Sequence, residues 1–170
     1  MSVTPRQIVP DVALDTVGSG RFVLSEQTPK AFTMIVVYRG LHCPICKNYL
    51  SDLNRRIDEF DALGVRAIAV TSDNAERAEK AKNDWKLDRL DIAYGMPIGL
   101  GREWGLYVST ALSDQEPTEF LEPGLFLVKP DRSLYAASIQ TMPFTRPSFA
   151  ELAGAIKFVT EKNYPARGEA

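Results

Sequence analysis

The sequence predicts a single α/β domain with a central mixed sheet flanked by helices. Two continuous apolar runs, residues 31–38 and 65–71, are rich in β-branched residues, which is typical of strands covered on both faces. Each run precedes a helical segment, and strand–helix–strand order implies parallel strands joined by a right-handed crossover. A chain of 170 residues is long enough for one domain with a sizeable core.

Residues 1–30 predict an N-terminal hairpin-like extension of this domain, which as a whole covers residues 1–170. Short apolar pieces at Val12–Leu14 and Phe22–Leu24 are separated by glycines, and prolines stand on either side. Short apolar runs around a glycine-containing turn are typical of a hairpin of weak strands.

The segment after the first strand predicts one long helix that begins at the motif His42–Cys46 and is closed by Gly64. Its apolar residues recur at steps of three and four and form one face: Ile45, Tyr49, Leu50, Leu53, Ile57, Phe60 and Leu63. Glycine commonly follows the last turn of a helix. The motif therefore lies at the start of this helix.

A polar helix is predicted after the second strand, and the signals between residues 91 and 117 are weaker. Asp73 or Asn74 is the expected cap of the polar helix, because both side chains accept N–H bonds at a helix start. Residues 91–96 predict a short strand and residues 99–108 a helical turn, followed by an irregular stretch.

A hairpin and a helix complete the chain. Residues 124–129 and 133–139 predict two strands around the turn sequence PDR. The closing helix is expected to have Thr145 as its cap and Pro147 in its first turn, followed by apolar residues at helical spacing. In this order the elements describe a thioredoxin-like fold.

Composition and charge exclude several classes of function. A formal net charge of −2 offers no basic field for phosphates, so we expect no nucleic-acid partner. No apolar run approaches the ~20 residues that span a bilayer, so we expect no membrane partner. The N-terminus lacks a basic segment followed by an apolar one, which predicts a cytoplasmic protein. In a reducing compartment, neighbouring cysteines more often serve catalysis or bind metal than cross-link a fold.

The motif His42-Cys43-Pro44-Ile45-Cys46 contains both cysteines and the only histidine of the chain. If Cys43 caps the helix, Pro44 is the first helical residue, where a missing N–H costs nothing. The Cys43 sulfur then faces free backbone N–H groups at the positive end of the helix dipole, which favours thiolate over thiol. We therefore expect Cys43 to be acidic and reactive.

Cys46 lies three residues further along the same helical face. This spacing separates the two Cβ atoms by about 5–6 Å, within reach of a disulfide after modest adjustment. A Cys43 thiolate could form a mixed disulfide with a substrate, which Cys46 then displaces. The pair is predicted to cycle between dithiol and disulfide, and the alternative is two inert cysteines packed in a helix.

No cofactor and no metal are predicted for this site. A tetrahedral zinc site takes four ligands, and His42 is the only third nitrogen or sulfur donor. A soft two-coordinate metal on the two sulfurs is the remaining alternative.

Two further residues of the motif region are candidates for a supporting role. Protonated His42 could lower the pKa of a neighbouring thiol or shuttle a proton, and the alternative is a polar loop residue beside the site. Arg39 offers a permanent positive charge four residues before Cys43, although arginine is also common in solvated loops.

Four segments resemble the alkyl hydroperoxide reductase and thiol-specific antioxidant group, the peroxiredoxin-like branch of the thioredoxin superfamily. They are VVYRGLHCPICKNYLSDL, GVRAIAVTSDN, PGLFLVKPDRSLY and the tail MPFTRPSF with YPARG. Peroxiredoxins use a thiolate assisted by a threonine or serine three residues earlier and by an arginine beside a later strand. The resemblance places Cys46 at the attacking position, Cys43 at the threonine and Pro123 at the arginine, so both helpers are missing unless Arg39 substitutes.

Similarity to thioredoxins implies other roles for the same residues. Cys43 then matches an exposed nucleophile and Cys46 a resolving thiol, and Pro123 falls near a proline, usually cis, that faces the dithiol. Val37 stands where thioredoxins have a buried acid, and His42 where they have a tryptophan. The route of deprotonation is therefore expected to differ.

The leading hypothesis is a thiol-disulfide oxidoreductase with an antioxidant role that cycles Cys43 and Cys46. The close alternative is a peroxiredoxin-type hydroperoxide reductase in which Cys46 attacks and Cys43 resolves. An alternative of another class is a non-catalytic redox sensor or interaction module. The expected partners are a dithiol reductant, a disulfide-containing protein or a small hydroperoxide, and the resemblance makes a homodimer a reasonable expectation.

Overall fold

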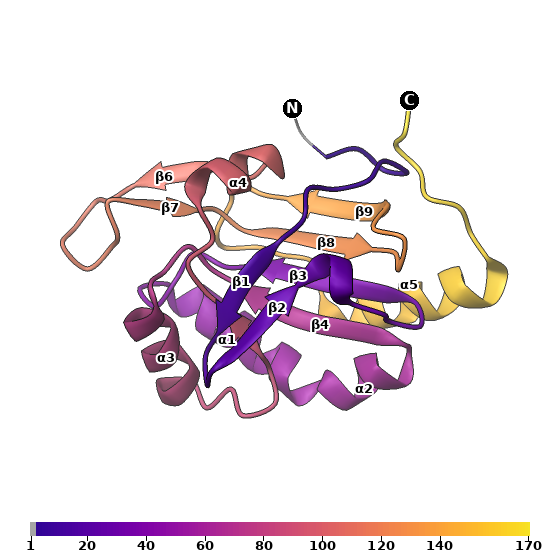
Figure 1. Cartoon of the computed structure of the whole chain (residues 1–170). Coiled ribbons are helices and arrows are strands. Elements are labelled where there is room, and N and C mark those ends of the chain that lie inside the picture. Colours follow the sequence, from indigo (N-terminus) through magenta and orange to yellow (C-terminus); the bar gives the residue numbers. More distant parts are fainter. Residues whose placement is uncertain (1–2) are drawn as a thin grey trace.

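The computed structural model describes residues 3–170 and shows a mixed sheet with helices on both faces (Figure 1). The seven strands lie in the order β2-β1-β5-β4-β3-β8-β9. Their bounds are β1 (Ala13–Thr16), β2 (Gly20–Val23), β3 (Phe32–Val37), β4 (Val65–Val70), β5 (Ile92–Ala93), β8 (Gly124–Val128) and β9 (Leu134–Ile139). A separate antiparallel pair consists of β6 (Val108–Thr110) and β7 (Glu119–Leu121). The helices are η1 (Leu24–Glu26), α1 (Pro44–Arg55), α2 (Ile57–Ala62), α3 (Ala75–Asp84), α4 (Ile98–Glu103) and α5 (Phe149–Lys162).

Strand β3 is the centre of the sheet, which confirms the prediction from its continuous apolar run. All six of its residues are buried. It pairs in parallel with β4 and antiparallel with β8, so that Val37 at its end lies beside Val70 and Gly124. Because β3 and β4 end at the same edge of the sheet, the segments that follow them meet there.

Two apolar layers cover this sheet. The alternating residues Met34 and Val36 of β3 face a layer formed by α1, α2, α3 and α5. The intervening residues Ile35 and Val37 face a second layer that includes Trp104 at the end of α4 and residues of β1, β2 and β7. The alternation follows from the period of two along a strand. Both sides of the central strands are therefore buried, as their composition predicts.

The hairpin predicted in residues 1–30 is present in the described part of that segment, which begins at residue 3. Strands β1 and β2 pair antiparallel, and β1 also joins β5 through the pair Thr16 and Ala93. The hairpin therefore extends the main sheet at one edge. Among residues 3–170, no helix combines the length and the apolar character needed to cross a membrane.

Three local predictions are wrong. The single helix expected up to Gly64 is two helices, because the backbone leaves helical geometry at Arg56, whose N–H donates to the Leu53 carbonyl oxygen at 2.9 Å. The cap of α5 is Ser148 and not Thr145, since the Ser148 side chain accepts the Glu151 N–H. Part of the stretch expected to be irregular forms β6, which pairs with β7 about ten positions further along the chain.

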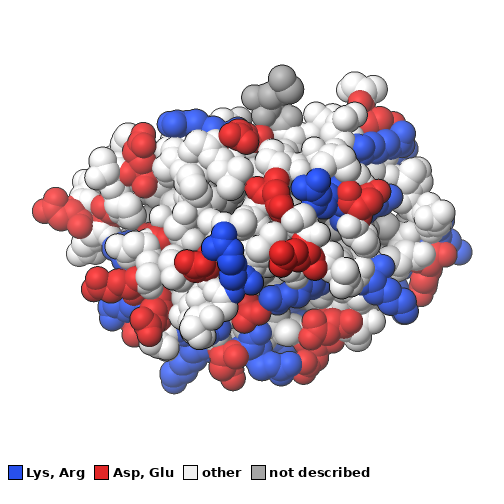
Figure 2. Space-filling view, in the orientation of Figure 1, with Lys and Arg blue, Asp and Glu red and all other residues white. Residues whose placement is uncertain are grey.

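Charged side chains are interspersed over the face of the molecule shown in Figure 2, where acidic and basic residues alternate. Exposed ion pairs of the molecule include Lys80 with Asp84 and Arg66 with Asp91. This distribution agrees with a formal net charge close to zero.

Candidate active site

Cys43 caps the first helix of the site, as predicted. The Cys43 sulfur accepts the backbone N–H of Cys46 at 3.2 Å, and Pro44 is the first residue of α1. The Cys43 backbone is extended and its own N–H donates to the Gly40 carbonyl oxygen at 3.1 Å. The chain from the end of β3 therefore turns once and places this sulfur at the positive end of the helix dipole.

The two thiols are free, and their pKa values are displaced in opposite directions. Hydrogen bonds from the Cys46 thiol and N–H, with Arg146 and Arg39, lower the pKa of Cys43 to about 5 against the effect of burial. Burial raises the pKa of Cys46, and its bond to Cys43 raises it further. The directions of these two shifts favour a negative charge on the Cys43 sulfur over one on the Cys46 sulfur.

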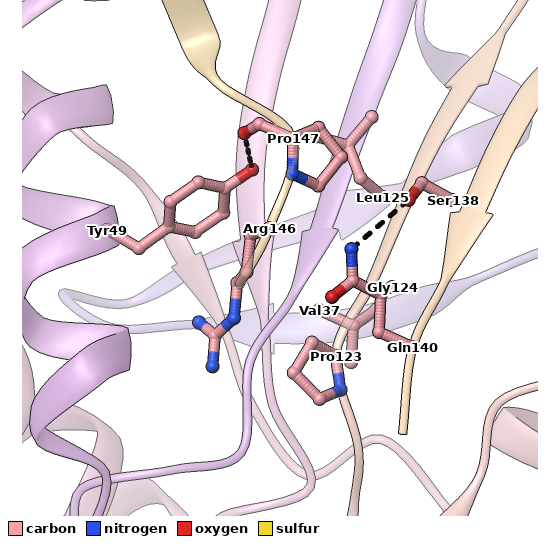
Figure 3. Close-up of a pocket in the computed structure, with 9 residues that line it drawn as sticks. All are labelled: Val37, Tyr49, Pro123, Gly124, Leu125, Ser138, Gln140, Arg146 and Pro147. Carbon is pink, nitrogen blue, oxygen red and sulfur yellow. Dashed lines mark hydrogen bonds between the residues drawn. The ribbon is translucent and has the colours of Figure 1, made fainter. Parts of the chain in front are cut away.

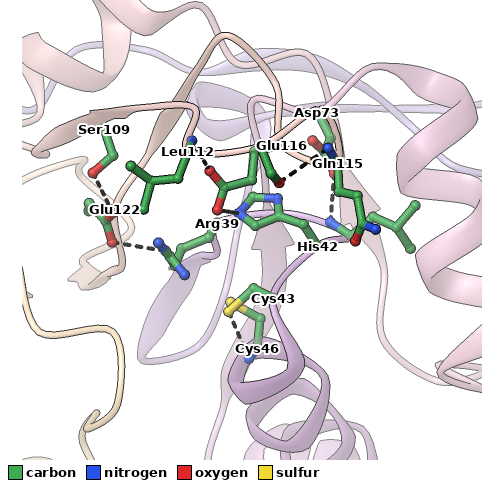
Figure 4. A network of polar contacts seen from close by, with 12 residues as sticks. Arg39, His42, Cys43, Cys46, Asp73, Ser109, Leu112, Gln115, Glu116 and Glu122 are labelled. Atoms are coloured by element: carbon green, nitrogen blue, oxygen red, sulfur yellow. Dashed lines mark hydrogen bonds and ion pairs between the residues drawn. The ribbon is translucent and has the colours of Figure 1, made fainter.

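Both sulfurs are enclosed, which differs from the exposed nucleophile that similarity to thioredoxins implied. Cys43 is 1% exposed and Cys46 is fully buried. The Cys43 and Cys46 side chains lie next to each other at the start of α1 in Figure 4. The enclosure is confined to these two side chains, because Pro44 and Lys47 of the same turn are exposed.

Arg146 is the main functional candidate that the sequence did not reveal. Its Nη2 lies 3.3 Å from the Cys46 sulfur and 3.8 Å from the Cys43 sulfur. The same nitrogen donates to the Pro143 carbonyl oxygen, and the guanidinium lies over the ring of Tyr49. One hundred residues separate Arg146 from Cys46, so no local pattern links them, and the only signal was its place in the tail segment that carries the family resemblance.

Arg39 contributes a second positive charge, held by a buried acid. Its Nε lies 3.1 Å from Oε2 of Glu122, which is 5% exposed and also accepts the Ser109 hydroxyl at 2.6 Å. The Arg39 guanidinium lies over the ring of Phe120. Figure 4 shows this chain of contacts from Ser109 to Arg39 beside the cysteines. Arg39 therefore lies where the sequence analysis expected a supporting charge, and it contributes to the low pKa of Cys43.

The His42 ring contacts Phe120, the same ring that Arg39 lies over, at 4.7 Å between ring centroids. Its Nδ1 lies 3.5 Å from Nη2 of Arg77, and its Nε2 lies 4.0 Å from Oε1 of Glu116. Burial and the charge of Arg39 lower the pKa of His42, so the imidazole is neutral at neutral pH. Of the two interpretations of His42, the geometry favours a polar residue of the loop over a cation that acidifies the thiol.

Pro123 lines a small hollow together with Arg146 (Figure 3). The hollow is open to solvent, and its empty space, with that opening included, is about 190 Å³. Its other lining residues are Val37, Tyr49, Gly124, Leu125, Ser138, Gln140 and Pro147. The peptide bond before Pro123 is trans, so the cis bond implied by similarity to thioredoxins is not found. Pro123 therefore forms part of the wall beside Arg146.

The described residues 3–170 contain no group of three or more His, Cys, Asp or Glu side chains placed to hold a metal ion. His42 is the neighbouring side chain that could bind a metal ion through nitrogen, and its ring nitrogens face Arg77 and Glu116.

Comparisons with known proteins bear on the family and the fold of the chain. The sequence profile of the AhpC/TSA family matches residues 5–137. A cysteine-to-serine mutant of peroxiredoxin 6 from Arenicola marina superposes with a TM-score of 0.81 at 15% identity, covering 95% of this chain and 76% of that one. AhpC from Enterococcus faecalis superposes with a TM-score of 0.75 at 15% identity, covering 98% and 99% of the two chains.

A further solved structure with the same fold is peroxidoxin BcpB from Mycobacterium tuberculosis, with a TM-score of 0.74 at 14% identity over 91% of this chain and 96% of that one. No curated protein sequence matches the chain. At these identities the solved structures establish the fold, and the profile match establishes the relationship in sequence.

Proposed function

This chain belongs to the AhpC/TSA family, and we propose that it is an oxidoreductase that reduces hydroperoxides, with Cys43 as the attacking thiolate and Cys46 as the resolving thiol. The observation that carries the proposal is the environment of the Cys43 sulfur. Its pKa is lowered to about 5 beside the guanidinium of Arg146, yet the residue is only 1% exposed. An enclosed, charge-stabilised thiolate is suited to a small substrate.

The proposed first step transfers two electrons from sulfur to oxygen. The Cys43 thiolate attacks the distal oxygen of the hydroperoxide, an S–O bond forms and the O–O bond breaks. The departing alkoxide takes up a proton and leaves as an alcohol, or as water when the substrate is hydrogen peroxide. Cys43 becomes a sulfenic acid.

The proposed second step closes the disulfide within one turn of α1. The Cys46 sulfur attacks the sulfur of the Cys43 sulfenic acid, and the hydroxyl group leaves with the Cys46 proton as water. A dithiol reductant then returns the disulfide to two thiols by exchange, and is itself oxidised. The cycle therefore needs a compartment that supplies a dithiol, such as the cytoplasm.

These roles are the reverse of those implied by the sequence resemblance, in which Cys46 attacks. The raised pKa of Cys46 keeps its proton in place, which is the state that a resolving thiol needs until the sulfenic acid has formed. Gly40 lies three residues before Cys43 and carries no hydroxyl. Arg146 and Arg39 are the positive groups that remain to stabilise charge on the departing oxygen.

Thiol–disulfide exchange with a protein substrate is the second candidate. It is favoured by the position of both sulfurs in the first turn of α1, because the internal disulfide can form without a second chain. A protein disulfide, however, must bring its own sulfur in line with Cys43, and the enclosure of Cys43 opposes that approach. A hydroperoxide of a few atoms needs much less room to reach the sulfur.

Stopped-flow oxidation of the reduced protein tests the proposal. Hydrogen peroxide and a small organic hydroperoxide are expected to oxidise the wild type and Cys46→Ser, and a sulfenic-acid trap is expected to label Cys43 in Cys46→Ser. Label on Cys46 in Cys43→Ser would instead assign the roles implied by the resemblance. Faster oxidation by a protein disulfide than by either peroxide would favour the second candidate.

Steady-state turnover with a dithiol donor separates an enzyme from a redox sensor or interaction module. Repeated consumption of peroxide supports the enzyme, whereas a single oxidation without cycling supports the sensor. We also propose a homodimer from the family relationship, and the sedimentation coefficient of the purified protein tests it.

A further inference from the structure

The buried carboxylate of Asp73 lies outside the dithiol but contacts the turn that leads to it. Asp73 follows β4, and its side chain is fully buried. Its Oδ2 accepts the backbone N–H of Leu41 at 2.8 Å, and its Oδ1 accepts Nε–H of Arg77 at 3.0 Å. Figure 4 shows Asp73 above the loop that carries His42 and Cys43. The carboxylate thus joins the start of α3 to the loop before α1.

The backbone at Gly40 passes directly over this carboxylate. Gly40 has a φ of +140°, and a Cβ built there would lie 2.7 Å from Oδ2 and 2.8 Å from Oδ1 of Asp73. Only glycine allows the chain to approach so closely with this backbone conformation. The Gly40 carbonyl oxygen in turn accepts the N–H of Cys43 at 3.1 Å. The turn from Gly40 to Cys43 is therefore held at one end by Asp73 and closed at the other by Cys43.

Asp73 is itself fixed by the sheet. Its N–H donates to Oγ1 of Thr71 at 3.1 Å, and its carbonyl oxygen accepts the N–H of Gly95 at 2.8 Å. Thr71 and Gly95 follow β4 and β5, two parallel strands of the main sheet. The carboxylate is thus placed by the rigid part of the molecule.

We propose that Asp73 is a positioning residue of the active site, which holds the turn Gly40–Cys43 so that the Cys43 sulfur stays at the cap of α1. The inference rests on the proposed function for the identity of the attacking sulfur. Asp73 can act on that sulfur in two opposite ways. A buried negative charge nearby disfavours a thiolate, whereas a well-placed cap favours it.

The variant Asp73→Asn shows which effect is larger, because it removes the charge and keeps the size of the side chain. Leu41 and Arg77 donate to different oxygens of the carboxylate. In the amide one of these oxygens is replaced by an NH2 group, which would face a donor, so one of the two contacts is lost. If positioning dominates, the rate of Cys43 alkylation by iodoacetamide at pH 5–6 falls about tenfold, as a smaller fraction of the sulfur is thiolate. Amide hydrogen exchange at Leu41 becomes faster in the same variant.

Asp11→Asn is the matched control. The Asp11 carboxylate also accepts two backbone N–H groups, those of Val12 and Ser25, but it lies in the N-terminal segment before β1. The alkylation rate is expected to remain at the wild-type value in this variant. Equal slowing in both variants would show a general loss of stability and would overturn the proposal.

Faster or unchanged alkylation in Asp73→Asn would also overturn it, because the charge would then be the larger effect. If Asp73→Asn does not fold, amide hydrogen exchange at Leu41 in the wild-type protein is the test. A strongly protected Leu41 amide supports the proposal, and a rapidly exchanging one contradicts it. Alkylation needs no hydroperoxide. Slow alkylation in Asp73→Asn together with no peroxide reduction by the wild type would therefore uphold the positioning role and reject the proposed function.

Discussion

The Tyr49 hydroxyl donates a hydrogen bond of 2.7 Å to the Pro147 carbonyl oxygen, and this contact ties α1 to the segment that carries Arg146. The Tyr49 ring also stacks on Phe149 at 4.2 Å between centroids, and the Arg146 guanidinium lies over it. One aromatic side chain on α1 thus holds both the start of α5 and the cation that faces the sulfurs. The contact explains how a residue a hundred positions away is brought to the dithiol.

Removal of this hydroxyl is expected to loosen Arg146 without destroying the fold. Tyr49→Phe keeps the stacking on Phe149 and loses one hydrogen bond, so the free energy of unfolding should fall by about 1 kcal/mol. The rate of oxidation by hydrogen peroxide should fall several-fold, because Arg146 is no longer held in one orientation. Denaturant unfolding and stopped-flow oxidation measure the two effects. An unchanged oxidation rate at reduced stability would show that Pro147 does not help to place Arg146.

Arg146 is expected to be the larger of the two cationic contributions to the site. In Arg146→Met the Cys43 sulfur loses a positive neighbour at 3.8 Å, so its pKa rises and the second-order rate constant with hydrogen peroxide falls about 100-fold. The pH dependence of alkylation and peroxide kinetics test both effects. Arg55→Met is the control, since Arg55 lies at the far end of α1 from the cysteines and its side chain is 69% exposed. A rate within a factor of about two of the wild type in Arg146→Met would count against the proposed role.

The low pKa of Cys43 predicts how reactivity and stability depend on pH. Alkylation of Cys43 should rise as the pH passes through about 5 and then level off, because the thiolate is the reactive form. A thiol whose pKa is lower in the folded state stabilises the fold fully above its ordinary value of 9.0, and this contribution is lost as the pH falls through about 5. Between pH of about 5 and 9.0 this thiol should make the free energy of unfolding of the wild type rise with pH, and Cys43→Ser should lack this contribution. A midpoint of alkylation near the ordinary value would contradict the assignment of Cys43 as the thiolate.

Oxidation of the pair is expected to release the segment that carries Arg146. A disulfide has no negative charge, so the guanidinium loses the thiolate that it faces in the reduced protein. Amide hydrogen exchange in residues 140–147 should become faster after stoichiometric oxidation, while exchange in β3 stays unchanged. Such loosening would also give a dithiol reductant access to sulfurs that are enclosed in the reduced form. Identical exchange in the two redox states would exclude this release.

Local features of the site were predictable because they depend on short-range rules. A cysteine before a proline at the start of an amphipathic helix predicts a capping sulfur, and the bond from the Cys46 N–H confirms it. The central position of β3 followed from its buried-type composition. The break at Arg56 and the cap at Ser148 were missed because alternative helix boundaries a few residues apart differ by small free energies.

By itself the sequence determined the strands β3 and β4, the hairpin and helix that close the chain, and the place of the thiol pair at a helix start, since each depends on local composition and spacing. The tertiary structure alone decided that Arg146 faces both sulfurs, that Glu122 holds Arg39, and that Cys43 is enclosed. Those contacts join segments far apart in the chain, and their geometry depends on how whole elements pack. Hydrophobic packing brings the elements together but is non-directional, so the apolar pattern of the sequence does not fix which polar side chains meet. The electrostatic potential at a sulfur depends on which charged groups lie within a few ångströms of it, and only the packed structure determines that.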